Sequence, residues 1–125
     1  MKWVPALTAL LPLGCAVAPG NREAATAPIQ VLTRSHNRSD VDVYLLCGDR
    51  DAEWLGVVPD KGATTFEIPA ERSRCAQGLN FFLVVQRSGW GYWVGPLRPR
   101  PGGYIDLVIE KYAGLSAGRV RADLH

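Results

Sequence analysis

The residues with the widest range of chemistry are the three cysteines, Cys15, Cys47 and Cys75. A cysteine thiol can be oxidised to a disulfide, bind a metal or carry an acyl chain. Three thiols cannot all pair within one chain, so one of them needs a separate explanation. Cys15 is set apart by its position, because it follows a basic residue, Lys2, and a mainly apolar stretch over residues 3–13. A short basic region before an apolar region is typical of an export signal.

The sequence LPLGC at residues 11–15 resembles the lipobox of bacterial lipoproteins, although Pro12 stands where that motif usually has leucine. The resemblance implies that residues 1–14 are a lipoprotein signal peptide. It also implies that Cys15 is acylated on its thiol, becomes the first residue of the mature chain and is then N-acylated. The apolar stretch is shorter than the ~20 residues that a transmembrane helix needs. Cleavage by the ordinary signal peptidase before Val17 is the alternative, and it would leave Cys15 in the discarded peptide.

Acyl chains on Cys15 would hold the protein on a membrane, because each buried methylene contributes ~0.8 kcal/mol. Ala16 stands directly after the cysteine, and alanine there, instead of aspartate, is compatible with sorting to the outer membrane. We therefore expect a lipid-anchored cell-envelope protein that faces the periplasm or the cell surface. Residues 16–28 are mainly small or turn-forming, and their apolar residues follow no regular period. We therefore expect residues 15–28 to be the lipidated cysteine and a flexible tether.

The remaining cysteines, Cys47 and Cys75, would then lie in an oxidising compartment, where thiols are usually paired. We expect one disulfide between them. In the chain-entropy model, a closed loop of about 29 residues stabilises the fold by ~3.6 kcal/mol. Two reduced, buried thiols are the alternative.

The rest of the chain has the period of β-strands. Val41, Val43, Leu45 and Cys47 alternate with other residues, as in a strand with one face in the core, and residues 105–110 repeat this pattern. The nearly continuous apolar run at 79–85 predicts a central strand that is covered on both faces. We expect an all-β fold, an antiparallel β-sandwich of about seven strands over residues 29–112. The expected strands are 29–34, 41–47, 54–58, 64–68, 79–86, 91–97 and 105–110.

Two segments outside these strands have less distinct patterns. Residues 69–77 predict a single helical turn. In residues 113–125, alternating Val120, Ala122 and Leu124 predict either an edge strand or a tail that frays at the terminus.

Three short segments within the expected domain are similar to small β-sandwich domains of bacterial envelope lipoproteins. They are Val-Asp-Val-Tyr at 41–44, Leu-Gly-Val-Val at 55–58 and Phe-Glu-Ile-Pro at 66–69. The resemblance implies an immunoglobulin-like or transthyretin-like sandwich. The same segments are also similar, but more weakly, to the short PEGA surface repeat. It implies no activity, because such sandwiches carry many unrelated functions.

Composition narrows the class of function. With 14 Lys+Arg against 12 Asp+Glu, the formal net charge is +2, which gives no electrostatic case for nucleic-acid binding. The hydrophobic share of 47% excludes wholesale disorder. The spacing of histidines, cysteines and carboxylates matches no metal site, and we expect no cofactor. The chain has two histidines, His36 and the terminal His125, so we expect no enzyme, with a small hydrolase that uses His36 as the alternative.

Aromatic residues among glycines are the best candidates for binding. Trp90 and Tyr92 would share one face of the strand at 91–97, while Trp93 takes the other face. Exposed tryptophan and tyrosine can stack on sugar rings or anchor a protein interface, whereas packing within the sandwich is the simpler explanation. The sequence thus predicts a non-catalytic binding or structural module whose partner is an envelope protein or a glycan. A carbohydrate-binding module that uses Trp90 and Tyr92 is the alternative.

Overall fold

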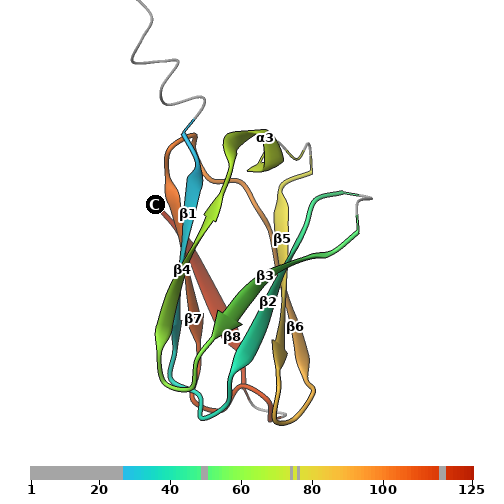
Figure 1. Ribbon diagram of the computed structural model, residues 1–125, viewed down its shortest axis with the longest axis vertical. Helices are drawn as coiled ribbons and strands as arrows, with labels where there is room; N and C mark the ends of the chain where they lie inside the picture. Colours follow the sequence, from blue (N-terminus) through green and yellow to red (C-terminus); the bar gives the residue numbers. More distant parts are fainter. Residues whose placement is uncertain (1–26, 49–50, 74, 76, 116–117) are drawn as a thin grey trace, which may run out of the picture.

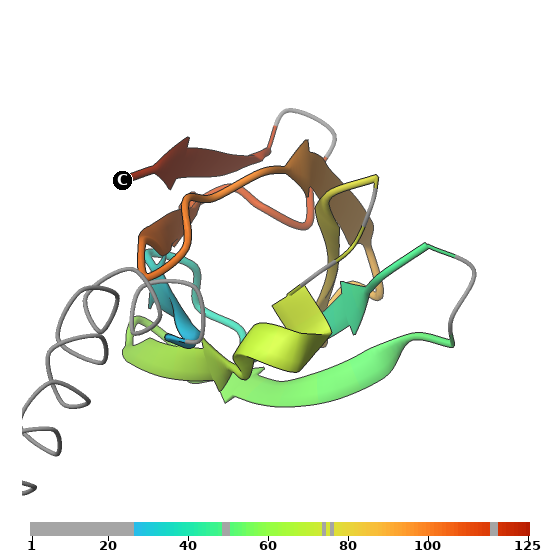
Figure 2. The same ribbon diagram turned by 90° about the horizontal axis from the view of Figure 1, so that it is seen from above.

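The protein is a sandwich of two four-stranded β-sheets, seen in a computed structural model that describes residues 27–48, 51–73, 75, 77–115 and 118–125 (Figure 1). The sheets face each other across a common core (Figure 2). The predicted all-β sandwich is therefore confirmed. Its elements are β1 (Ile29–Ser35), β2 (Val41–Leu46), β3 (Glu53–Val58), β4 (Ala63–Ile68), α3 (Ala70–Ser73), β5 (Leu79–Val85), β6 (Gly91–Leu97), β7 (Tyr104–Ile109) and β8 (Val120–Leu124).

The strands form where the sequence alternates, because every second side chain enters the core. In β2, Val41, Val43 and Leu45 are buried, and the residues between them are half-buried on the other face. In β1 the same alternation buries a polar residue, Thr33, whose hydroxyl donates a hydrogen bond to the backbone carbonyl of Thr64 in the neighbouring strand β4. A buried hydroxyl is tolerated there because it has a partner.

One sheet has the order β4-β1-β7-β8 and the other the order β3-β2-β5-β6. All neighbouring strands are antiparallel except β1 and β7, which are parallel. The sequence predicted about seven strands, and β8 is the eighth. It pairs with β7 from Ile105↔Leu124 to Ile109↔Val120, so this segment is an edge strand.

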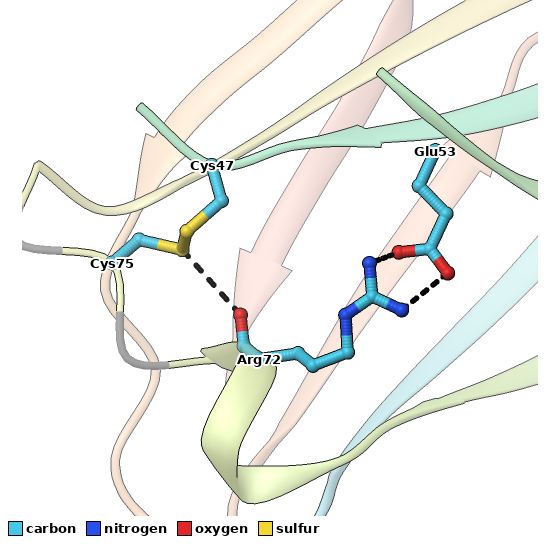
Figure 3. A network of polar contacts seen from close by, with 4 residues as sticks. All are labelled: Cys47, Glu53, Arg72 and Cys75. Atoms are coloured by element: carbon cyan, nitrogen blue, oxygen red, sulfur yellow. Dashed lines mark hydrogen bonds and ion pairs between the residues drawn. A yellow bond between two sulfur atoms is a disulfide. The ribbon is translucent and has the colours of Figure 1, made fainter. Parts of the chain in front are cut away.

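The end of the sandwich at which the chain enters β1 is closed by a short helical connection. After β4, the single turn α3 leads to Cys75, which forms the predicted disulfide with Cys47 just beyond β2. The two Cα atoms are 5.5 Å apart, within the usual range for a disulfide. Arg72 of α3 forms an ion pair with Glu53 at the start of β3, and its backbone carbonyl lies 3.5 Å from the Cys75 sulfur (Figure 3). The connection between the two sheets is thus fastened at two neighbouring points.

Among the described residues, no helix has the length and apolar character that crossing a membrane requires.

Candidate binding surface

Four aromatic side chains form a line across the outer face of the β3-β2-β5-β6 sheet. Each strand contributes one of them: Trp54, Tyr44, Phe82 and Trp93, in that order. The register places Tyr44 opposite both Trp54 and Phe82, and Phe82 opposite Trp93. Residues opposite one another in a sheet lie on the same face. We call this line the aromatic row.

Trp54 belongs to the aromatic row because of an irregularity in the pairing of β2 with β3. Val43 pairs with Gly56, but Tyr44 pairs with Trp54, so Leu55 is an extra residue in β3. A β-bulge of this kind shifts the side-chain alternation by one position. Leu55 consequently packs against the core and Trp54 faces outward.

The two ends of the aromatic row are open to solvent and its middle is supported. Trp54 is 56% exposed and Trp93 is 66% exposed, whereas Tyr44 and Phe82 are half-buried between them. The rings of Phe82 and Trp93 are 5.1 Å apart with an interplanar angle of 52°, a favourable tilted arrangement. A Cβ atom at position 91 would lie 2.3 Å from Cζ of Phe82, so glycine there leaves room for that ring. The aromatic row is therefore exposed to solvent at its two ends, and ring packing supports it at Phe82.

Asp42 is the one charged residue among the outward positions of these four strands, all of which the structure describes. Its carboxylate accepts a hydrogen bond from Nε1 of Trp54 at 3.1 Å and another from Nε2 of Gln86 at 3.1 Å. The first bond orients the Trp54 indole, and a charged acceptor makes it stronger than a neutral one. The other outward side chains are mainly apolar or amide: Leu46, Val57, Asn80 and Val84.

The sequence predicted that β5 would be covered on both faces, and this is only half right. Its inward residues, such as Phe81 and Leu83, are fully buried, but Phe82 and Val84 on the outer face are half-buried and no described element packs over them. The apolar run correctly indicates that the outer face of β5 is apolar. Among the described residues, no second layer covers that face.

The predicted pair Trp90 and Tyr92 lies elsewhere. Tyr92 packs against the core, and its hydroxyl accepts a hydrogen bond from the backbone N–H of Gly114. Trp90 is 45% exposed, and its ring centroid is 6.5 Å from that of Tyr92. By strand alternation both belong to the opposite face of β6 from Trp93. Sequence reasoning placed Trp93 on the other face but missed its alignment with three other aromatic residues.

The remaining predicted residues are not brought together. Cys15 and the lipobox-like segment lie outside the described residues. His36 is exposed in the β1–β2 loop, and its imidazole has no hydrogen-bond partner among the residues that the structure describes. Within the same part of the chain, no three His, Cys, Asp or Glu side chains are close enough to hold a metal ion.

No protein family model matches this chain, and no curated protein matches it.

Proposed function

We propose that this protein is a lipid-anchored cell-envelope protein whose sandwich binds a neutral, extended glycan along the aromatic row. The observation that carries the glycan assignment is the alignment of four aromatic rings, one from each strand of the sheet. The flat apolar faces of sugar rings stack on aromatic side chains, while sugar hydroxyls need hydrogen-bonding groups beside them. Asp42 and the amides of Asn80 and Gln86 supply such groups.

The spacing of the aromatic row suits a ligand of several sugar rings. Neighbouring strands are about 4.8 Å apart, so the row from Trp54 to Trp93 extends over about 14 Å at the level of the backbone. A linear chain of sugars laid across the strands would meet an aromatic ring at each step. A single sugar would leave most of the row unused.

The size of the exposed aromatic surface favours a glycan over a protein partner. An aromatic side chain has roughly 150–250 Å² of surface, so two tryptophans that are 56% and 66% exposed, with two half-buried rings, present on the order of 400 Å². A stable protein interface needs about 800 Å² on each partner. The row has about half of that area, whereas exposed apolar patches of roughly 300–600 Å² are commonly functional.

The lipid anchor rests on the sequence alone, through the LPLGC segment that ends at Cys15. Intact-mass measurement of protein extracted from membranes tests it. We expect a chain that begins at Cys15 and carries acyl mass. A chain that begins at Val17, or at Cys15 without added mass, would refute the anchor and leave the glycan proposal standing.

An array of neutral oligosaccharides of two to six rings, probed with the purified full chain, tests the glycan proposal. For the best glycan on the array, we expect Trp93→Ala and Trp54→Ala each to weaken binding by about tenfold. The estimate assumes that one indole face covers about 60 Å² of sugar at ~25 cal/mol per Å², or ~1.5 kcal/mol.

Trp90→Ala is the matched control, because it removes an indole of similar exposure from the same part of the chain but from outside the row. We expect it to bind as the unmodified protein does. If Trp90→Ala abolishes binding while Trp93→Ala does not, the binding surface is at Trp90 and Tyr92 and the aromatic row is not the site. No binding to any neutral glycan would also overturn the proposal.

A further inference from the structure

A second surface feature lies at the end of the sandwich opposite to the point where the chain enters β1 (Figure 1). It is a cleft of about 440 Å³ between the β1–β2 loop, the β5–β6 turn and the β7–β8 loop. Its charged lining residues are Arg38, Arg87 and Lys111, one from each of these segments. Three cations from three segments thus line one cleft, and none of its described lining residues is a carboxylate.

Hydrogen bonds between the loops hold the walls of this cationic cleft in place. Asn37 is only 6% exposed, and its side-chain amide donates to the backbone carbonyls of Lys111, at 3.0 Å, and Ala113. The hydroxyl of Ser39 accepts a hydrogen bond from the backbone N–H of Arg87 at 2.9 Å. The first contact joins the β1–β2 loop to the β7–β8 loop, and the second joins it to the β5–β6 turn. A site built on such fixed loops binds without a large ordering cost.

None of the three cations forms an ion pair with a carboxylate in the part of the chain that the structure describes. Among the residues that the structure describes, the arginines in ion pairs are Arg34, Arg72, Arg119 and Arg121, and none of these lines the cationic cleft.

The two carboxylates nearest in sequence are already engaged. Asp40 accepts a hydrogen bond from the backbone N–H of Asp60, and Glu110 forms ion pairs with Arg119 and Arg121. With a formal net charge of only +2 for the whole chain, this local excess of positive charge is not a general property of the surface.

The chemistry of the lining selects a doubly charged oxyanion beside a ring. A guanidinium offers paired N–H donors that match the oxygens of phosphate, and two arginines with a lysine suit a phosphomonoester better than a single carboxylate. The hydroxyl of Ser88 accepts the N–H of Trp90, so its hydrogen can be donated to a ligand. Tyr112 is 58% exposed on the same wall, with the ammonium of Lys111 5.5 Å from its ring centre. An aromatic wall beside the cations provides a stacking surface for a sugar.

We infer that the cationic cleft binds the phosphomonoester of a phosphorylated saccharide. A phospholipid headgroup offers the same anion. The choice of a saccharide rests on the lipid anchor proposed above, because the chain enters the sandwich from that anchor at Ile29, and the cleft lies at the opposite end, the end farther along the sandwich from the anchored segment.

Isothermal titration calorimetry of the purified full chain tests this inference with four soluble probes. They are a phosphorylated N-acetylglucosamine, unmodified N-acetylglucosamine, inorganic phosphate and dihexanoyl phosphatidic acid. We expect the phosphorylated sugar to bind most tightly, and its affinity to fall as salt screens the charges. Arg87→Gln and Arg38→Gln should each weaken binding at least tenfold, and Arg87→Lys should weaken it less than Arg87→Gln does.

Arg34→Gln is the matched control, since it removes the same charge from the outer face of the other sheet, where Arg34 pairs with Asp106. An equal loss in Arg34→Gln, or no binding of the phosphorylated sugar, would overturn the inference. Equally tight binding of inorganic phosphate or of the phosphatidic acid would overturn the assignment to a saccharide.

The proposal for the aromatic row and the proposal for the cationic cleft can be refuted independently of each other. Trp93→Ala should leave binding of the phosphorylated sugar unchanged, and Arg87→Gln should leave binding of the neutral glycan unchanged.

Discussion

The disulfide is expected to supply a large part of the stability of this domain, and its contribution can be worked out from the fold. Cys47 and Cys75 are separated by 28 positions, so the loop that they close has a chain entropy equivalent to ~3.6 kcal/mol in the unfolded state. For a domain of this size, 1 kcal/mol corresponds to about 4–8 °C in Tm. We therefore expect the double variant Cys47→Ser/Cys75→Ser, which leaves neither cysteine of this pair as a free thiol, to melt roughly 15–25 °C lower.

The neighbouring ion pair between Arg72 and Glu53 provides a comparison for the effect of the disulfide on Tm. Arg72 and Glu53 fasten the same connection, but their side chains are 41% and 35% exposed, so solvent screening limits the pair to about 0.2–1 kcal/mol. Arg72→Gln alone should consequently lower Tm by only a few degrees. In a double-mutant cycle, any coupling between the disulfide and the ion pair would appear as non-additive losses of the free energy of unfolding.

Thermal unfolding followed by circular dichroism is the assay, with the unmodified protein in dithiothreitol as a second route to the same state. The Tm of the reduced protein and the Tm of the double variant should agree within a few degrees. If the double variant melts within about 5 °C of the unmodified protein, the entropic reasoning is wrong. Residues 47 and 75 would then already lie close together in the unfolded ensemble without the disulfide.

Three further predictions concern the two surfaces and the edge of the sheet. Gly91→Ala should displace the Phe82 ring, shift the fluorescence of Trp93 that it contacts, and cost only about 1 kcal/mol because this half-buried ring can move toward solvent. Asn37→Ala should cost about 2–3 kcal/mol in urea unfolding, since backbone carbonyls of the β7–β8 loop lose their donor, whereas Asn80→Ala on the outer face should cost less than ~0.5 kcal/mol. Deletion of β8 should expose the edge of β7 and produce oligomers in size-exclusion chromatography; a monomeric deletion variant would contradict this.

The strands could be predicted from the sequence because their signal is local. Alternation, apolar or β-branched runs and turn residues are all visible within five or six positions, and together they predict the seven expected strands that the structure contains. The single helical turn expected within residues 69–77 is α3. The partner of each strand is not local. Nothing in residues 29–35 indicates that β1 runs parallel to β7, since this pairing joins segments far apart in the chain.

The candidate site shows the same limit. The prediction of Trp90 and Tyr92 rests on a local inference, because residues two positions apart in a strand share a face. The aromatic row depends on three strand pairings and on the extra residue Leu55, all of which follow from tertiary packing. The apolar run in β5 indicated an unusual outer face, but a run of apolar residues has the same form whether another layer covers it or solvent does.

The bulge at Leu55 couples two features that have no contact with each other. Beyond it, Trp54 faces outward, so Glu53 faces the interior side, where it meets Arg72 (Figure 3). If the same residues paired without the bulge, Leu55 would stand opposite Tyr44 and Trp54 opposite Leu45, and the start of β3 would be turned over by half a rotation. Trp54 would then leave the row and Glu53 would leave its arginine, although neither residue had been substituted. Deletion of Leu55, by contrast, would keep Tyr44 opposite Trp54 and Leu45 opposite Glu53 in a regular ladder, so both features depend on which residue of β3 is left unpaired.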